Sequence, residues 1–439
     1  MARNLWRESR LLIVNHSLLA SHFVLGGRFL PEFSHLVVDE AHRFPDTFHE
    51  AFISSASFSE MEALFHEVGR DGPDLTSLFE VFRSRLTAAL TLARGEQRRL
   101  TAGLALSEAR NLESAMEKCA RLLAKSMEAL QSQQELGFAG GEARMENSVE
   151  MMRVQARIER VNSVRSLVRG LLAGPAQGEV LWLTRVDRDG PLSDYRVQLA
   201  PLRPGELLQE KFFPQLRSVV FTSATLAARA SDPFAYFARE LGYSREAGPR
   251  VLQLDSPFAY RENSLLYLPG QMPDPSRQED AFHRAAAGEI QRLLELTHGG
   301  AFVLFTSRRS LRAVQSLLGR SSGNYTLISQ VAGDRLRLVI LVRLPFRVPD
   351  EPLHAARMEE ERAAGRDPFQ SLQLPQAVIS MKQGYGRLIR SVSDRGIVSI
   401  LDPRLRTKGY GRDIMQTLPD SQRVYSFNDL TQAYKKLFN

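Results

Sequence analysis

Two carboxylates and an imidazole stand together where a short apolar run ends. Residues 36–38 (Leu-Val-Val) are followed at once by Asp39, Glu40 and, two positions after Glu40, His42. Asp39 is the candidate Mg²⁺ ligand, acting through water, because Mg²⁺ keeps much of its hydration shell. Glu40 is placed to orient or deprotonate an attacking water, and His42 to couple this site to a neighbouring domain by hydrogen bonding. This is the chemistry of triphosphate hydrolysis.

Two other interpretations of this acidic pair stay open. One is a strand that runs into a turn carrying solvated acids. The other is a metal-dependent nuclease built on Asp39 and Glu40. No further acidic cluster and no metal-spaced histidine group in the sequence favours the nuclease.

Hydroxyl groups follow a second apolar run. Residues 217–221 form this run and lead into residues 222–226 (Thr-Ser-Ala-Thr-Leu). At a buried strand end, Ser223 and Thr225 could relay motion between a nucleotide site and a bound nucleic-acid strand. A simple helix N-cap explains the same residues equally well.

Two arginines suited to phosphate lie far downstream, within residues 383–390 (Gln-Gly-Tyr-Gly-Arg-Leu-Ile-Arg). We predict that Arg387 and Arg390 share one face of a helix, from which both guanidinium groups reach the same phosphate. Gln383 and Gly386 belong to the same candidate catalytic and nucleotide-binding segment. The alternative is a pair of surface arginines.

One expected part of such a site is missing from the sequence. No Gly-x-x-x-x-Gly-Lys-Ser/Thr phosphate loop occurs in the 439 residues. Without its lysine and its backbone amides, ATP lacks its main anchor. We therefore expect an incomplete motor that does not hydrolyse ATP alone.

Composition and charge bound the remaining possibilities. A chain of 439 residues is too long for one core. Its net charge of +7 suits a polyanionic partner but is a weak signal alone.

The single cysteine, Cys119, excludes an intramolecular disulfide, and we expect it to be a core or surface thiol. Apolar runs are far shorter than a bilayer span, and no signal peptide is evident, so we expect a cytoplasmic protein without a membrane partner.

The pattern of apolar residues predicts an α/β protein with a helical insertion. Residues 10–14 and 34–38 are interpreted as buried parallel strands. Residues 57–172 have helical spacing, with an apolar stripe and a glycine-rich connection. The apolar stripe consists of Leu112, Met116, Cys119 and Leu122, and the glycine-rich connection runs from Gly137 to Gly141.

A hairpin and a second α/β region follow. The hairpin has strands at residues 179–186 and 194–199 around Asp189-Gly190. The second region has alternating strands and helices. Its predicted elements are strands at 301–305, 336–342 and 396–401 and a helix at 309–318.

Together these motifs resemble the DinG branch of the XPD-like superfamily 2 DNA helicases, in order and over nearly the whole chain. The matching segments are 14–19 (Val-Asn-His-Ser-Leu-Leu), 36–42, 222–226, 256–258 (Ser-Pro-Phe), 344–346, 374–379, 382–391, 401–405 and 408–411. The resemblance implies two RecA-like parallel-sheet domains, a helical arch inserted in the first, ATP and Mg²⁺ as cofactors, and 5′→3′ unwinding of DNA in repair or replication. It also implies single-strand contacts at Asn15, His16, Thr306 and Ser307.

On this resemblance the chain divides into four parts. These are a truncated first RecA-like domain with the DEAH box (1–56), the arch (57–172), a return to the first domain (173–230) and the second RecA-like domain (231–439).

Three departures from the family limit what the resemblance implies. The phosphate loop is absent, and one cysteine cannot provide an iron–sulfur cluster with four thiolates. A Trp-Glu-Gly-type motif is deleted around residues 328–334. We expect single-stranded or forked DNA as a partner, together with a separate chain that carries the phosphate loop. The alternative is a non-catalytic single-stranded-DNA-binding or scaffolding module.

Overall fold

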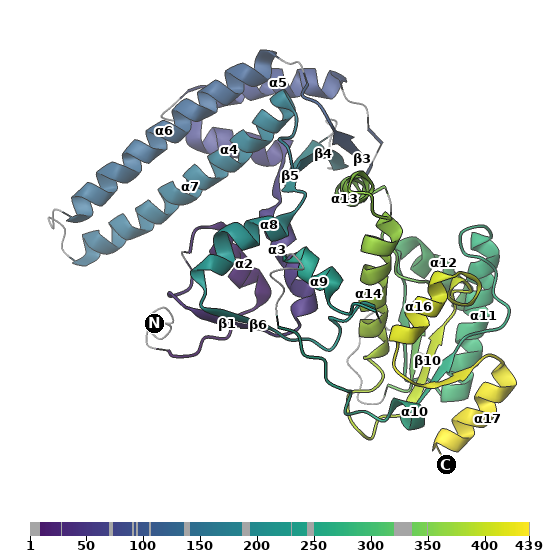
Figure 1. Cartoon of the computed structure of the whole chain (residues 1–439). Coiled ribbons are helices and arrows are strands. Elements are labelled where there is room, and N and C mark those ends of the chain that lie inside the picture. The colour runs from purple at the N-terminus through teal and green to yellow at the C-terminus, as the bar shows by residue number, and fades with distance from the viewer. Residues whose placement is uncertain are drawn as a thin grey trace. The chain divides into compact units, whose positions relative to one another are not determined.

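The structure is a computed structural model, and it describes twelve stretches of the chain. These are residues 9–27, 29–69, 73–89, 92–93, 95–104, 107–135, 141–186, 194–229, 231–243, 250–319, 336–348 and 350–438. They belong to two units (Figure 1). The first unit comprises Met1–Phe33, Phe44–Phe212 and Pro349–Arg357, and the second comprises Ser34–Arg43, Phe213–Val348 and Met358–Asn439.

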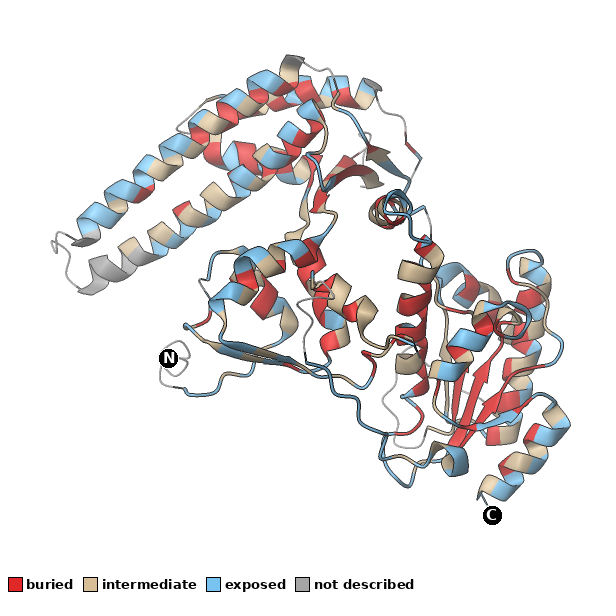
Figure 2. Ribbon diagram, viewed as in Figure 1, coloured by how far each residue is buried: buried red, intermediate tan, exposed pale blue. Residues whose placement is uncertain are grey.

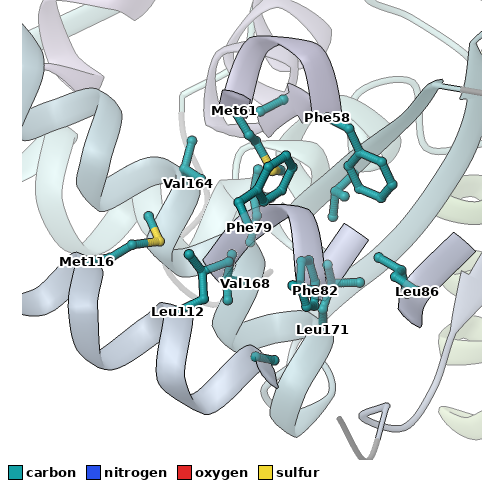
Figure 3. Packing of buried hydrophobic residues seen from close by; sticks show 14 of the residues in the cluster. Phe58, Met61, Phe79, Phe82, Leu86, Leu112, Met116, Val164, Val168 and Leu171 are labelled. Atoms are coloured by element: carbon teal, nitrogen blue, oxygen red, sulfur yellow. The ribbon is translucent and has the colours of Figure 1, made fainter. Parts of the chain in front are cut away.

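Helices dominate the first unit. Its two longest, α6 (Ser107–Glu135) and α7 (Gly141–Ala173), lie side by side, and α4 (Phe58–Val68) and α5 (Leu75–Ala89) pack against them (Figure 1). Phenylalanine, methionine and leucine side chains of these helices fill one core (Figure 3). This confirms the predicted helical insertion.

The predicted apolar stripe is correct at three of its four positions. Leu112, Met116 and Cys119 are buried in this core, whereas Leu122 is 46% exposed. Leu123 packs against the core instead, because it lies four residues after Cys119 and so on the same face of α6. Cys119 is therefore a core residue, and burial raises the pKa of its thiol.

The prediction that residues 57–172 are entirely helical is wrong, because a strand at Gln97–Leu100 lies within this range. A four-stranded antiparallel sheet has the order β2-β5-β4-β3. Its strands are β2 (Ser54–Ser57), β3 (Gln97–Leu100), β4 (Glu179–Val186) and β5 (Asp194–Pro201). The hairpin of β4 and β5 is confirmed, while Asp189-Gly190 lies outside the described residues. Strand β3 gave no apolar signal because it is a polar edge strand with one buried residue, Leu100.

The predicted strand at residues 10–14 is wrong. Leu11 and Ile13 are 78% and 88% exposed, and no strand pairs with this segment in the described part of the chain. An apolar run becomes a buried strand only where a neighbouring backbone accepts its hydrogen bonds. The first unit also contains α2 (His16–Val24), α3 (Phe44–Phe52), α8 (Pro204–Leu207) and η3 (Leu208–Phe212), whereas η1 (Ala41–Arg43) belongs to the second unit.

A five-stranded parallel sheet forms the centre of the second unit, in the order β11-β7-β10-β9-β8. Its strands are β7 (Ser264–Tyr267), β8 (Ala301–Leu304), β9 (Leu338–Leu341), β10 (Gly396–Ile400) and β11 (Gln422–Val424). The three inner strands are buried throughout (Figure 2). The predicted strands β8, β9 and β10 are therefore confirmed.

Helices cover both faces of this sheet. Leu338 and Ile340 of β9 face a core shared with α11 and α17, whereas Val339 and Leu341 face a core shared with α14. The helices and remaining short elements of this unit are η4 (Phe213–Gln215), α9 (Ala235–Glu240), α10 (Tyr260–Asn263), α11 (Glu279–Thr297), α12 (Arg308–Leu318), α13 (Pro352–Ala363, shared with the first unit), η5 (Phe369–Gln373), α14 (Leu374–Tyr385), α15 (Arg404–Thr407), α16 (Tyr410–Thr417) and α17 (Phe427–Phe438). Predicted helix 309–318 is confirmed as α12.

The second unit also holds a separate parallel pair, β1 (His35–Val38) with β6 (Ser218–Phe221). Both strands were predicted, but as buried ones. Val37 and Val220 face each other in register and are 69% and 53% exposed. One face of this pair is therefore open to solvent in the described structure. No described helix is long and apolar enough to cross a membrane.

Helix α14 approaches the sheet so closely that one glycine is required. A Cβ atom on Gly384 would lie 2.8 Å from Leu341 Cδ2 and 3.1 Å from Leu304 Cδ1. Gly386, by contrast, has an ordinary φ of −65°, and its nearest neighbour would lie at 3.3 Å.

We expect Gly384→Ala to lower the free energy of unfolding by about 1–3 kcal/mol, because an added methyl group overpacks a filled core. Urea unfolding followed by circular dichroism measures this loss. Gly386→Ala is the matched control, with a smaller expected effect. Equal losses in the two variants would contradict the close approach.

A buried carboxylate joins α13 to its surroundings in the second unit. Glu361 accepts two hydrogen bonds from Arg366, at 2.7 and 2.8 Å, and lies 3.6 Å from an Arg239 nitrogen. Hydrogen bonding from Arg366 is the main cause that lowers the pKa of Glu361 to about 2, against the opposing effect of burial.

A lowered pKa in the folded state gives stability that is present above the ordinary value of 4.5 and is lost as the pH falls toward 2. We therefore expect Glu361→Gln to be less stable than the parent chain at pH 7, with the difference shrinking between pH 4.5 and 2. Urea unfolding between pH 7 and pH 2 measures this difference in the free energy of unfolding. Glu359→Gln, at an exposed position on the same helix, is the control. A difference that does not change with pH would count against the ion pair.

Candidate nucleotide and nucleic-acid site

The parallel pairing of β1 and β6 brings two of the predicted motifs together. His35 pairs with Ser218 and Val38 with Phe221, so the two strands end at the same level. The backbone pairing continues past the strand ends, with Thr222 N donating to Val38 O at 2.9 Å and Ala41 N donating to Thr222 O at 3.0 Å. The residues that follow each strand therefore lie side by side.

His42 is the polar centre of this strand end. Its Nδ1 lies 2.8 Å from Ser223 Oγ, 3.1 Å from Thr225 Oγ1 and 3.2 Å from Glu40 Oε2. When Nδ1 carries the proton it donates to one of these oxygens, and when it does not, either hydroxyl can donate to it. The His42 side chain is 7% exposed, whereas Glu40 is 64% exposed. The structure thus joins three predicted residues, Ser223, Thr225 and His42, and places Glu40 at their solvent side.

The Glu40 backbone has a left-handed conformation, with φ of +48°. A residue other than glycine in this region stores strain, and such residues gather at functional sites. Here the left-handed turn redirects the chain directly after β1, and Arg43 N closes it by donating to Glu40 O at 3.0 Å. Asp39 and Glu40 both remain exposed beyond the strand end.

The donor set at this end fits a Mg²⁺ ion that arrives with a phosphate. Mg²⁺ typically takes one or two carboxylates, with waters and phosphate oxygens completing its coordination. Asp39 offers one such exposed carboxylate. Among the described residues, no three His, Cys, Asp or Glu side chains are grouped to hold a metal ion by themselves.

The second predicted motif lies at the carboxyl end of α14 and differs from its prediction. Helix α14 contains Gln383 but ends at Tyr385, and Gly386 is its C-cap. Arg387 and Arg390 therefore do not share a helical face. They lie in the turn that follows, where both are exposed. Helix α14 ends two residues before Arg387, which the spacing of the two arginines alone did not indicate.

The turn that carries these arginines is fixed by a carboxylate. Asp394 Oδ2 accepts hydrogen bonds from the backbone N–H groups of Arg390 and Ser391, both at 2.7 Å. Burial acts to raise the pKa of Asp394, but these backbone bonds hold it below its ordinary value. The Arg387 guanidinium lies 5.4 Å from the centre of the Phe302 ring.

Lys382 was not assigned a role from the sequence. Its Nζ donates to Ala227 O at 2.8 Å, and burial lowers its pKa. Ala227 directly follows the Thr-Ser-Ala-Thr-Leu segment, so this bond ties α14 to the segment that ends β6. A lysine one residue before Gln383, in an otherwise apolar helix, was the available signal.

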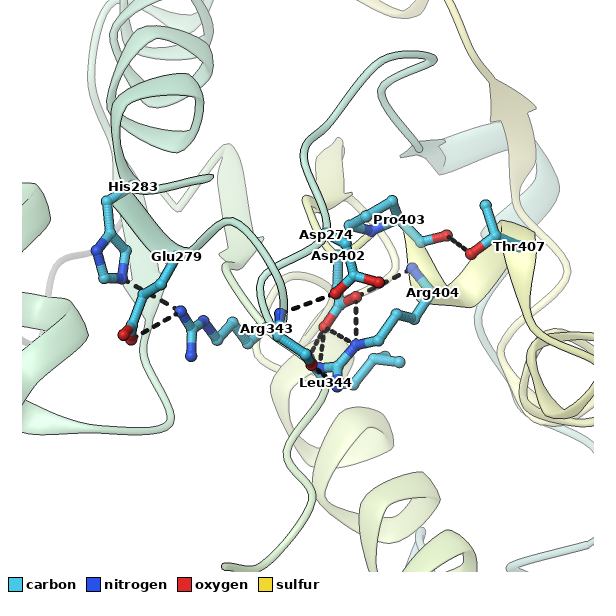
Figure 4. A network of polar contacts seen from close by, with 10 residues as sticks. Asp274, Glu279, His283, Arg343, Leu344, Asp402, Pro403, Arg404 and Thr407 are labelled. Carbon is cyan, nitrogen blue, oxygen red and sulfur yellow. Dashed lines mark hydrogen bonds and ion pairs between the residues drawn. The ribbon is translucent and has the colours of Figure 1, made fainter. Parts of the chain in front are cut away.

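A second polar network closes the carboxyl ends of β9 and β10 (Figure 4). Buried Asp402 accepts hydrogen bonds from Leu344 N at 2.9 Å and from Arg404 Nη2 at 2.6 Å. Burial acts against the charge of Arg404, but the Asp402 carboxylate keeps its pKa above the ordinary value. Arg343 beside it reaches Glu279 at 3.1 Å. Asp402 and Arg404 belong to the sequence motif at residues 401–405, but the sequence alone did not predict a role for either residue.

The four predicted nucleic-acid contacts include two helix N-caps. Asn15 accepts a hydrogen bond from Leu18 N at 2.8 Å and caps α2, in the first unit. Ser307 accepts one from Ser310 N at 3.1 Å and caps α12, in the second unit. Thr306 is exposed next to Ser307, and the His16 ring centre lies 6.2 Å from that of Phe44. Thr306 and Ser307 follow β8 at the carboxyl edge of the five-stranded sheet.

Comparisons with known proteins agree with these motifs. The family model described as a helicase C-terminal domain matches residues 329–421. A protein of Bacillus subtilis named 3′-5′ exonuclease DinG is 28% identical over 99% of this chain and 54% of its own length. An ATP-dependent DNA helicase YoaA of Haemophilus influenzae is 29% identical over 98% of this chain and 70% of its own length. The chain thus spans about half of the Bacillus relative.

Solved structures agree on the fold. S. tokodaii Xpd4 superposes with a TM-score of 0.58 at 15% identity, over 92% of this chain and 79% of that one. An XPD structure without ligand gives a TM-score of 0.56 at 15% identity, over 93% and 81%. The fold is accordingly α/β, with two RecA-like parts and a helical insertion. Over nearly its whole length the chain is thus similar in sequence to proteins named DinG and YoaA, and it is similar in fold to the XPD structures.

Proposed function

We propose that this chain is the motor part of an ATP-dependent DNA helicase that moves 5′→3′ on single-stranded or forked DNA. The observation that carries the proposal is the strand end shared by β1 and β6, where Glu40, His42, Ser223 and Thr225 converge. Exposed Glu40 after β1 contacts the His42 imidazole, which also contacts the two hydroxyls after β6. This arrangement suits a site that hydrolyses ATP and passes the resulting change on to a bound DNA strand. The family relatives named as DNA helicases support the substrate.

Each residue of the site has a proposed role. Asp39 holds Mg²⁺ through water, and the ion would offset charge on the outer phosphates of ATP. Glu40 orients the attacking water and accepts its proton. Arg387 and Arg390, with Gln383 and Gly386 in the same segment, approach the phosphates from the turn after α14. An exposed turn lets guanidinium groups adjust their position, which a rigid helical face would not.

Coupling to DNA is proposed to run through the hydroxyl pair. His42 contacts both Ser223 and Thr225, so a change at Glu40 can reach the end of β6 through one side chain. Asn15, His16, Thr306 and Ser307 are proposed to contact the sugar-phosphate backbone, since amide, imidazole and hydroxyl groups bind it without reading bases. A role in DNA repair or replication in the cytoplasm is consistent with this chemistry.

The phosphate loop is proposed to come from another polypeptide segment or a separate chain. This sequence contains no Gly-x-x-x-x-Gly-Lys-Ser/Thr segment. The open valine face of β1 and β6 is a natural surface for a covering helix of that segment, because parallel sheets are normally covered by helices on both faces. One cysteine cannot supply four thiolates, so we propose no iron–sulfur cluster held by this chain alone.

A second candidate is a non-catalytic module that binds single-stranded DNA, favoured by the missing phosphate loop. It predicts binding that weakens with salt and does not respond to nucleotide. Absence of binding at low salt would exclude it.

We expect the purified chain alone to release phosphate from ATP no faster than buffer, with or without single-stranded DNA. Mixed with a polypeptide that carries the phosphate loop, it should show DNA-stimulated hydrolysis. Glu40→Gln should then reduce the rate by on the order of 100-fold, because it removes the base while keeping the side chain's size. Glu50→Gln, an exposed acid on α3, is the control. A Glu40→Gln assembly with the parent rate would contradict the assignment.

We expect the double variant Ser223→Ala, Thr225→Val to lose DNA stimulation while keeping basal hydrolysis in the same assembly. Both hydroxyls that contact His42 are removed, but Glu40 is not. The ratio of rates with and without DNA should fall toward about one, the value for an uncoupled site. Thr225→Ser, which retains a hydroxyl, should preserve stimulation. Undiminished stimulation in the double variant would exclude this coupling route.

A further inference from the structure

A proline lies inside a continuous helical stretch of the second unit, where the π-helical turn η5 runs directly into α14. Pro375 is the second residue of α14. It has no backbone N–H to offer the carbonyl oxygen of Ser371, four positions earlier. The wider π-helical turn accommodates the proline, and Leu374 N donates to Phe369 O instead of to Gln370 O. The carbonyl oxygens of Gln370 and Ser371 therefore lose the donors that a regular α-helix would give them.

Two arginines from another segment donate to these two oxygens. Arg229 Nη2 donates to Gln370 O and, at 3.2 Å, to the side-chain Oε1 of the same residue. Arg239 Nη2 donates to Ser371 O, and its guanidinium also lies 3.6 Å from Glu361. Hydrogen bonds from a guanidinium are charge-assisted and stronger than those between neutral groups. Helix α14 is thus held from outside at the point where its own hydrogen bonding is interrupted.

A third cation ties the same segment to the other end of α14. Lys382 Nζ donates to Ala227 O at 2.8 Å. Lys382 lies seven residues after Pro375, which is about two helical turns further along and on the same face of the helix. Residues 227–239 are therefore bonded to α14 just before its start and again within one turn of its end.

The helix held in this way connects two parts of the proposed hydrolytic site. Residues 222–226, whose hydroxyls contact His42, run directly into residues 227–239. At its carboxyl end, α14 runs into the turn that carries Arg387 and Arg390. A helix of 12 residues is a rigid rod about 18 Å long. A shift of residues 222–226 is therefore passed through this rod to both arginines.

The same part of α14 contains a buried amide without a partner. Both side-chain polar atoms of Gln376, the residue after Pro375, are buried and accept or donate no hydrogen bond within the described structure. Leaving such atoms unpaired costs stability, and in native structures they can mark a reservoir of strain. This cost favours a contact that changes during the reaction over one selected for stability alone.

We propose that Arg229, Arg239 and Lys382 form a latch that positions the two arginines after α14 according to the state of residues 222–226. These three are positioning residues, because they act through α14 and not on ATP itself. The proposal rests on the proposed function and deepens it, since it supplies a path from the hydroxyl pair at His42 to the arginine turn.

Hydrogen exchange of the full chain, followed by mass spectrometry without nucleotide or DNA, tests the latch. Arg229→Met, Arg239→Met removes the donors at the start of α14. The amides of residues 386–388, which donate to carbonyl oxygens at 2.8 to 3.3 Å, should then exchange at least about fivefold faster, although they lie at the opposite end of the helix. Residues 222–225 should show the same increase, while exchange in strand β9 should not change.

Arg406→Met, Arg423→Met is the matched control in the same unit. These two arginines also donate to backbone carbonyl oxygens, those of Pro269 at 3.2 Å and Met415 at 3.4 Å. Unchanged exchange of residues 386–388 in the latch variant, or an equal increase in the control, would overturn the latch. Because no hydrolysis is measured, failure of the ATPase experiments leaves this result independent.

A single substitution repeats the exchange test from the other end of α14, in case the double variant does not fold. Lys382→Met, at a half-buried position, should speed exchange of residues 222–225 at least about threefold. Lys382→Arg, which keeps a cationic donor, should restore the parent rate. Equal rates in Lys382→Met and the parent chain would contradict the role of this lysine.

Kinetics in the assembly with the phosphate-loop polypeptide separate positioning from a merely structural role. Lys382→Met should lower the DNA-stimulated kcat at least about tenfold and leave KM for ATP within about twofold, because the arginines are misplaced only for the transition state. Lys382→Arg should recover most of the lost kcat. An increase in KM without a change in kcat, or an equal loss in both variants, would overturn the positioning role.

Discussion

The in-register pairing of β1 with β6 is the constraint on which the candidate hydrolytic site depends. Each strand is only four residues long, yet 183 positions separate the paired residues His35 and Ser218. Because both strands run the same way and end together, Glu40 after one strand and the hydroxyls after the other meet at His42. A slip by one residue would turn the side chains of one strand to the other face and separate these groups.

Charge is used differently in the two units. Between α6 and α7, arginines such as Arg165 and Arg169 are paired with glutamates and help to hold two long helices together. In the second unit, Arg387 lies in the turn between α14 and β10, and Lys408 and Arg412 lie at the start of α16; these three have no acidic partner among the described residues. Half-exposed ion pairs add little stability, but they neutralise charge that would otherwise attract polyanions. The positive charge of these three residues is therefore available to polyanionic ligands.

Sequence reasoning succeeded where burial alone decides the structure. Strands such as β9 and β10 are continuous apolar runs in a sheet covered on both faces, and this pattern has few other solutions. Sequence reasoning failed where contacts with a distant segment of the chain determine the local structure. Residues 10–14 have the composition of a strand without a paired neighbour, and Arg387 lies beyond the end of α14 at Tyr385, which its spacing from Arg390 did not reveal. The acids and hydroxyls of the site were identified from their positions after strands, but their meeting point at His42 required the register.

The exposed valine pair of β1 and β6 has a consequence for the behaviour of the protein in solution. Val37 and Val220 form a cross-strand apolar pair open to water, and neither outer edge of these strands is paired within the described structure. Such an edge presents unpaired backbone groups beside an apolar face, which is the arrangement that templates strand addition. This small sheet should therefore let the chain self-associate by strand addition as its concentration rises.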